Sequence, residues 1–213
     1  MLFRSKAQKY AALFAAAWMT TVSVASAQDR FPAIPEDKMT PAQKKVNDAV
    51  KAGPRGALNG PFIPMLRSPE LDNRVQAVGE YLRFGSAIGR RLTEFTILIT
   101  ARHWTQNYEW ATHYGLAIKE GIKKDVADAI GDGRRPQGMA EDEEIVYEFC
   151  TELQENKSVT DATFARAQKK FGDQGVIDMT GLVGYYTLLA TILNVSRTPP
   201  EAANPPQLKP FPK

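Results

Sequence analysis

Apolar residues recur every three or four positions along most of the chain, and Gly, Pro, Ser and Thr separate the periodic stretches. This spacing is typical of amphipathic helices that bury one face. The alternation of apolar and polar residues that marks strands, and the short turn sequences that mark hairpins, are not found. The pattern therefore predicts an all-α domain of about seven or eight helices.

Capping residues indicate where the predicted helices begin and end. Thr40 precedes a helix that Gly53 ends, and Ser68 is expected to cap the helix that follows. Gly172 is expected to end the penultimate helix, before a long apolar helix. The apolar face of the helix after Ser68 is predicted to consist of Leu71, Val75, Val78 and Leu82.

The N-terminal residues 1–27 have the pattern of a secretory signal peptide. Three basic residues precede an apolar run at 11–19, and Ala-Ser-Ala at 25–27 provides the small residues that a signal peptidase recognises. An uncleaved membrane anchor is the alternative, although the apolar run is short for a bilayer span. We therefore expect an exported protein, located in a bacterial periplasm.

Cleavage after Ala27 would leave 186 of the 213 residues, enough for one domain with a full core. The predicted segments are an extended N-terminal segment at 28–39, the helical domain at 40–197 and a Pro-rich tail at 198–213. The whole chain has 27 Lys and Arg residues against 24 Asp and Glu, and three of the basic residues lie in the signal. The remaining charge is zero, so no nucleic-acid partner is expected. We expect no later run to be long and apolar enough to span a bilayer, so no membrane partner is expected either.

Glu94, Glu109 and His113 occupy helix faces where apolar residues are expected. Glu109 and His113 lie four positions apart and therefore share one face of a helix. Tyr108 and Trp110 belong to the same helix. Glu94 lies in an apolar stripe of the preceding helix, so the two helices could bring all three residues together. A carboxylate next to an imidazole in apolar surroundings can hold a proton and shift the histidine pKa. Alternatively, a Glu and a His at this spacing form an ordinary surface pair.

Cys150 is the only cysteine and lies at helical spacing with apolar residues. It cannot form an internal disulfide, and we expect a buried, inert side chain. The chain has no Gly-rich phosphate loop and no zinc-type Cys and His spacing. No cofactor is therefore expected.

Three segments resemble the carboxymuconolactone decarboxylase-like superfamily, which includes the alkylhydroperoxidase D-type peroxidases. They are LNGPFIPMLRSPELDNRVQAVGEYLRF, RLTEFTILITARHWTQNYEWATHYGLAIKEGI and GYYTLLATILNV. The resemblance covers about 40–198. It implies a small all-α domain that forms a homotrimer or hexamer, with its site between helices and near a subunit contact.

The peroxidase branch of this superfamily carries Cys-x-x-Cys-x-x-x-His, with a relay Glu twelve residues before the first cysteine. Here Glu94 and His113 match the Glu and the His, but Gln106 and Glu109 occupy the two cysteine positions. Neither side chain can form a thiolate or close a disulfide. The resemblance therefore supports the fold and argues against a thiol peroxidase.

The branch without these cysteines is similar to the present sequence and implies cofactor-free acid–base chemistry on a small carboxylated lactone. By this resemblance His113 would transfer the proton, Glu109 would orient the His113 side chain, and Glu94 would relay the proton or tune the histidine. The residues expected to bind a small-molecule substrate are Arg90, Arg91, Gln106, Tyr108 and Trp110. Because lactone degradation is a cytoplasmic type of pathway, export argues for a different substrate of the same kind. The alternatives are a non-catalytic oligomer that binds a small ligand, or a metal site formed by Glu94, Glu109 and His113.

Overall fold

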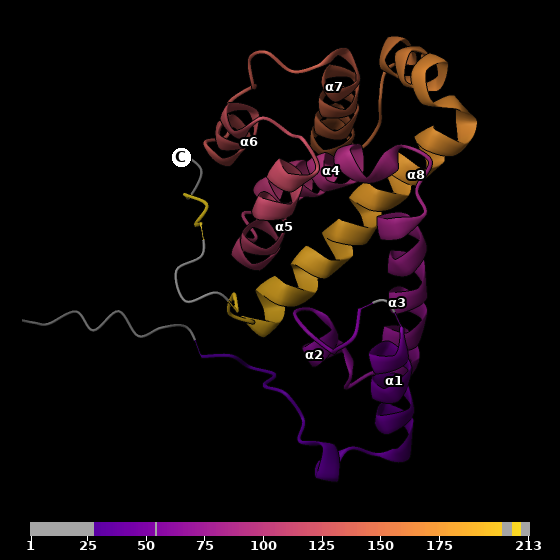
Figure 1. Cartoon of the computed structure of the whole chain (residues 1–213), viewed down its shortest axis with the longest axis vertical. Helices are drawn as coiled ribbons and strands as arrows, with labels where there is room; N and C mark the ends of the chain where they lie inside the picture. Colours follow the sequence, from indigo (N-terminus) through magenta and orange to yellow (C-terminus); the bar gives the residue numbers. More distant parts are fainter. Residues whose placement is uncertain (1–27, 54, 202–205, 210–213) are drawn as a thin grey trace, which may run out of the picture.

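The computed structural model describes residues 28–53, 55–201 and 206–209. In these ranges the chain forms eight α-helices and one short 3-10 helix, η1, and contains no strand (Figure 1). This confirms the predicted all-α class. The elements are η1 (Glu36–Lys38), α1 (Pro41–Ala52), α2 (Phe62–Met65), α3 (Pro69–Phe84), α4 (Gly89–His103), α5 (Asn107–Lys119), α6 (Lys124–Gly131), α7 (Glu141–Asn156) and α8 (Asp161–Ser196).

Helix α4 lies at the centre of the fold and is buried at every position from Leu92 to Arg102. It packs against α5, α6, α7 and α8, as Figure 1 shows. A helix that is apolar on nearly all faces needs such a position. The hydroxyls of Thr96 and Thr100 donate to the carbonyls of Leu92 and Thr96, one turn earlier, so these buried polar groups are satisfied within the helix.

Helix α8 consists of two helical parts that meet at Gly172. Gly172 has non-helical backbone angles, φ 68° and ψ 178°, and the chain bends there before a second helical part begins. The expected break at Gly172 is therefore present in the structure. By length and composition, α8 could also cross a membrane, contrary to our expectation that no such run exists. Among the described residues, no other helix meets these two criteria. About 56% of its apolar window is buried inside the protein, as in a core helix.

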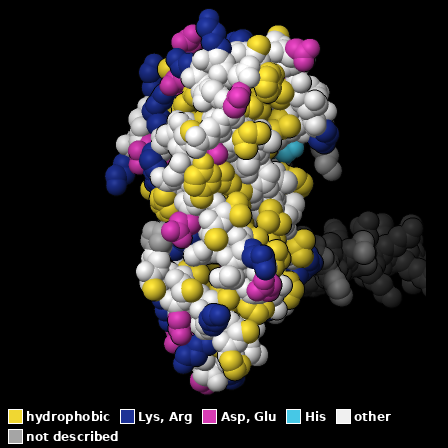
Figure 2. All heavy atoms as spheres, turned by 90° about the vertical axis from the view of Figure 1, so that its right-hand side faces the viewer, with side chains coloured by type: hydrophobic (Ala, Val, Ile, Leu, Met, Phe, Trp, Pro, Cys, Tyr) yellow, Lys and Arg dark blue, Asp and Glu magenta, His cyan; other side chains and the backbone are white. Residues whose placement is uncertain are grey.

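The capping predictions are correct for α1 and wrong for α3. Thr40 forms a capping box with Gln43, whereas the side chain of Ser68 makes no capping hydrogen bond. The predicted apolar face of α3 is also only partly buried, because Leu71 and Val78 are 44% and 51% exposed. Figure 2 views this side of the molecule and shows apolar side chains at the surface among the charged ones. The homo-oligomer stays a prediction, and this apolar surface is compatible with it.

The two ends of the chain lie against the helical domain where they are described. The predicted signal peptide, 1–27, lies outside the described residues. Segment 28–39 is non-helical apart from η1. In the Pro-rich tail, Leu208 is buried and its N–H donates to the Asn107 side chain at the start of α5. The tail therefore contacts the element that carries Glu109 and His113.

Asp72 in α3 is fully buried, and neither of its carboxylate oxygens has a hydrogen-bond partner in the structure. Burial raises the pKa of Asp72 to about 7, against an opposing effect of the Arg55 charge. A carboxyl whose folded-state pKa is raised lowers stability as pH rises from its unfolded pKa to its folded one. Relative to Asp72→Asn, we expect the wild type to lose about 2 to 4 kcal/mol of unfolding free energy between pH 4.5 and 8.

Urea unfolding at the two pH values measures this change. The matched control is Asp48→Asn, because Asp48 is exposed on α1 and should show no such divergence. A constant difference between Asp72→Asn and the wild type at both pH values would contradict the assignment of Asp72 as a destabilising buried carboxyl.

Candidate functional site

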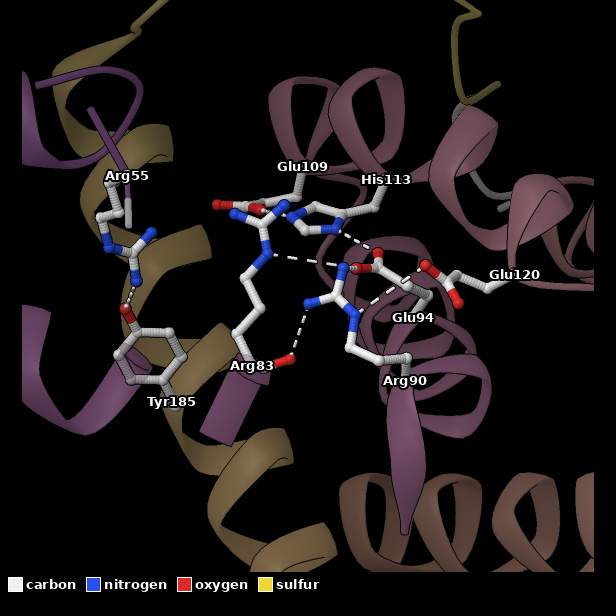
Figure 3. Close-up of polar contacts among 8 residues, drawn as sticks. All are labelled: Arg55, Arg83, Arg90, Glu94, Glu109, His113, Glu120 and Tyr185. Carbon is white, nitrogen blue, oxygen red and sulfur yellow. Dashed lines mark hydrogen bonds and ion pairs between the residues drawn. The ribbon is translucent and has the colours of Figure 1, made fainter. Parts of the chain in front are cut away.

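Glu94 from α4 and His113 from α5 form a buried pair at the centre of the domain (Figure 3). Their exposed fractions are 0% and 3%, and His113 Nδ1 lies 2.5 Å from Glu94 Oε2. The two helices are joined by a short turn in which Thr105 has a positive φ of 47°. Helix α5 therefore packs against α4, and the two side chains meet inside the protein.

Glu109 lies on the other side of the imidazole. Its Oε2 is 3.4 Å from His113 Nε2, and its Oε1 is buried with no hydrogen-bond partner in the structure. Each ring nitrogen of His113 thus faces a carboxylate. The three residues predicted as catalytic lie in one continuous contact network, as the sequence analysis anticipated from the adjacent helices.

The charges in this network depend on one another. Burial disfavours the imidazolium, but the contacts with Glu109 and Glu94 outweigh it, so the pKa of His113 is raised above its ordinary value. Burial opposes the ionised form of Glu94, but His113, Arg83 and Arg90 outweigh it and lower the pKa of Glu94. Both directions favour an imidazolium next to an ionised carboxylate. The Tyr186 ring packs against the His113 imidazole in a T-shaped arrangement, with 5.4 Å between the ring centroids.

Two guanidinium groups lie near the Glu94 oxygen that does not contact His113. Arg90 Nη2 and Arg83 Nε lie 3.6 Å and 4.0 Å from Glu94 Oε1. Arg90 also donates to the carbonyl of Arg83 at 2.9 Å and lies near Glu120. Arg90 therefore contacts Glu94 and the end of α3 and does not line the cavity described below; its role as a substrate anchor stays a prediction.

A cavity of about 140 Å³ opens beside Glu109 and His113. Tyr108 lies in its wall, where the phenol donates to the carboxylate of Glu201 from the C-terminal tail at 2.8 Å. Tyr108 therefore lines the cavity, and its contact with substrate stays a prediction. The lining residues are Arg55, Asn59, Pro61, Phe62, Arg83, Tyr108, Glu109, Thr112, His113, Tyr186, Leu189 and Glu201.

Three residues expected to bind substrate lie outside this cavity. Arg91 forms ion pairs with Asp142, at 2.5 Å, and with Glu143, which join α4 to α7. Gln106 caps α5 by accepting from the backbone N–H of Tyr108, and it donates to the side chain of Asn194. Trp110 is buried against the ring of Tyr114. All three make contacts within the protein and do not line this cavity, and their contact with substrate stays a prediction.

Sequence reasoning missed Arg55 and Arg83, the two arginines in the cavity wall. Arg55 lies in the loop after α1, and Arg83 lies in the last turn of α3. Neither belongs to the segment that carries Glu94, Glu109 and His113. The sequence offers one hint, a glycine at position 79 within the helical pattern, one turn before Arg83. In the described residues, no group of three or more His, Cys, Asp or Glu side chains has the geometry of a metal site.

No family model and no curated protein matches this chain. Several solved structures share its fold, and two of them are peroxidase-related proteins. The first is an alkylhydroperoxidase AhpD core, an uncharacterized peroxidase-related protein from Ralstonia eutropha JMP134, with TM-score 0.63, 15% identity and coverage of 78% of this chain and 88% of that one. The second is an uncharacterized peroxidase-related protein from Silicibacter sp. TM1040, with TM-score 0.65, 13% identity and coverage of 90% and 100%.

The chain therefore has an alkylhydroperoxidase AhpD-like fold over most of its length. At 15% and 13% identity, the likeness to these two proteins establishes the fold alone. The chemistry has to be argued from the site.

Proposed function

We propose that this protein is a cofactor-free acid–base enzyme of the decarboxylase or isomerase type, which acts on a small carboxylated or lactone substrate. One observation carries the proposal. The Glu109 carboxylate lies in the cavity wall with an unpartnered buried oxygen, and its other oxygen contacts an imidazole that Glu94 holds. Such an arrangement supplies a proton acceptor with a proton source directly behind it.

We propose a different division of roles from the one that the resemblance implies. Glu94 contacts His113 Nδ1 and so orients the ring, while Glu109 contacts Nε2 and lines the cavity. In the proposed reaction Glu109 exchanges the proton with the substrate carbon. His113 stabilises the ionised form of Glu109 and can return a proton to it, and Glu94 balances the imidazolium charge.

An isomerisation by this site would have two proton transfers. Glu109 takes a proton from a carbon next to a carbonyl, and the electron pair of the broken C–H bond moves onto the carbonyl oxygen as an enolate. The protonated Glu109 then returns the proton to a different carbon of the conjugated system. In a decarboxylation, the C–C bond to the leaving carboxylate supplies the electron pair, carbon dioxide departs and Glu109, protonated by His113, gives the proton to carbon.

The similar solved structures are described as peroxidase-related, which raises the question of thiol peroxidase activity. The environment of Cys150 does not support this activity. Cys150 is fully buried between α7 and the core, and burial raises the pKa of its thiol to about 12. A protonated, inaccessible thiol reacts poorly with peroxide.

We therefore expect Cys150→Ser to leave any hydroperoxide turnover and any lactone turnover unchanged within about twofold. We also expect Cys150 to react with a thiol reagent such as dithionitrobenzoate only when the protein is unfolded. Rapid labelling of the folded protein, or peroxide consumption that the substitution abolishes, would contradict this assignment.

Export and assembly belong to the same proposal. The basic and apolar pattern of 1–27 supports a location outside the cytoplasm, and the exposed apolar residues of α3 support a homotrimer or hexamer. N-terminal sequencing of the secreted protein and its mass in solution test these two points separately.

The proposed function is tested by turnover on a panel of carboxylated lactones, with hydroperoxides plus a dithiol as the comparison. We expect loss of lactone, with or without release of carbon dioxide, and no peroxide consumption above the buffer rate. Binding of panel members without any turnover would replace the enzyme with the alternative, a small-ligand-binding protein on the same fold.

A further inference from the structure

Two arginines that come from separate parts of the chain enter the wall of the same cavity. Arg55 reaches in from the loop after α1, and Arg83 reaches in from the end of α3 (Figure 3). The Arg55 guanidinium lies 4.4 Å from the centre of the Phe62 ring and donates to the Tyr185 hydroxyl at 3.3 Å. These contacts fix the plane of the guanidinium.

Neither guanidinium is neutralised by a carboxylate at hydrogen-bond distance in the described structure. The shortest carboxylate contact of Arg83 is the 4.0 Å ion pair with Glu94, whose Oε2 is already bound to His113. The Nε atoms of both Arg55 and Arg83 are buried without a hydrogen-bond partner. The Arg55 charge acts to lower the pKa of Asp72, but the Asp72 carboxylate makes no hydrogen bond to Arg55. Partly buried guanidinium groups in this condition favour a bound anion.

The position of Arg55 depends on Gly79, which has no side chain. A Cβ atom on Gly79 would lie 1.9 Å from the Tyr185 hydroxyl and 2.7 Å from Arg55 Nη2. Both distances are too short for real atoms, so only glycine at this position lets Tyr185 and Arg55 meet above α3. The arginine is held by a specific arrangement of three elements, which distinguishes it from a surface cation.

Charge and size in the cavity restrict what could bind between the arginines. The acids of the wall are Glu109 and Glu201, and Glu201 already accepts the hydrogen bond of Tyr108. The volume of about 140 Å³ is well below the ~300 to 1,000 Å³ of pockets for drug-sized ligands. The cavity therefore suits a small molecule with an anionic group at one end.

We propose that Arg55 and Arg83 bind the carboxylate of a small organic acid and so direct its reactive carbon toward Glu109. This assignment rests on the proposed function and adds the substrate class and the residues that select it. A planar carboxylate matches the donors of guanidinium groups, and a neutral amide of the same shape does not. Discrimination between an acid and its amide is the property that the two arginines would confer.

The test measures binding of benzoate and of its neutral analogue benzamide to the purified protein by titration calorimetry. We expect benzoate to bind at least tenfold more tightly than benzamide. Arg55→Met and Arg83→Met should each weaken benzoate binding by tenfold or more and leave benzamide unchanged. The matched control is Arg74→Met, since Arg74 is exposed on α3 and pairs with Glu70.

Circular dichroism of each variant separates a lost site from a lost fold, and Arg55→Lys provides a second variant that keeps the charge. Arg55→Lys should retain part of the benzoate preference that Arg55→Met removes. Equal affinity for benzoate and benzamide in the wild type, or an equal loss in Arg74→Met, would overturn the proposal.

The same titrations on Glu109→Gln separate this inference from the proposed function, because binding does not require proton transfer. Benzoate binding that persists in Glu109→Gln supports the arginine site even if no turnover is ever found. Turnover that survives both arginine substitutions would overturn the arginine site and leave the acid–base proposal standing.

Discussion

Replacing Glu109 with glutamine should reduce turnover by about 10² to 10⁴-fold, the usual contribution of a positioned acid–base group. Glutamine keeps the size and hydrogen-bonding reach of the side chain but cannot accept a proton from carbon. The Oε1 atom of Glu109 is buried in the cavity wall without a hydrogen-bond partner, so no protein group is placed to accept the proton instead. The loss should appear in kcat, because binding by the arginines is retained.

Steady-state kinetics on the lactone that the wild type turns over measures this effect. The control is Glu141→Gln, since Glu141 is an exposed residue at the start of α7. A Glu109→Gln variant with activity within threefold of the wild type would remove Glu109 from the proposed mechanism.

Replacing His113 with asparagine should lower the free energy of unfolding by about 3 to 5 kcal/mol near pH 6, because it leaves Glu94 and Glu109 as buried carboxylates without their partner. The raised pKa of His113 provides stability that is complete below its unfolded pKa and lost as pH rises through its folded pKa. The lowered pKa of Glu94 provides stability above its unfolded pKa that is lost as pH falls through its folded pKa. The penalty should therefore be largest between about pH 4.5 and 6.5.

Urea unfolding of the wild type and His113→Asn from pH 5 to 10 tests this dependence. The exposed His103 supplies the control, His103→Asn, with an expected change below about 1 kcal/mol. A penalty that stays constant or grows toward alkaline pH would show that the imidazolium is not the stabilising form.

The helical periodicity was sufficient to predict the core of the site. Glu94 and His113 were predicted to meet because adjacent helices joined by a short polar turn pack against each other, and each residue interrupted an apolar face. Helix phase could also have separated Arg90 from Arg91. Arg90 lies four residues before Glu94 and therefore shares its face, whereas Arg91 is rotated by about 100° toward α7.

The other side of the cavity could not be predicted from local pattern. Arg55 lies in a loop without periodicity, and its approach to Tyr185 joins residues 130 positions apart. That contact depends on tertiary packing over Gly79, which a single sequence presents only as an unexplained glycine in a helix. The exposed Leu71 and Val78 show the same limit, since periodicity identifies an apolar face but not what covers it.

The central claim is that Glu109, with His113 and Glu94 behind it, transfers protons to and from carbon. The most direct measurement is incorporation of solvent deuterium into carboxylated lactones in D₂O, followed by proton NMR, with wild type, Glu109→Gln and His113→Asn compared after each is shown to be folded. We expect incorporation by the wild type next to the lactone carbonyl, and a loss of at least 10²-fold in both variants. Incorporation that continues unchanged in Glu109→Gln, or its absence in a wild type that binds the same lactones, would contradict it.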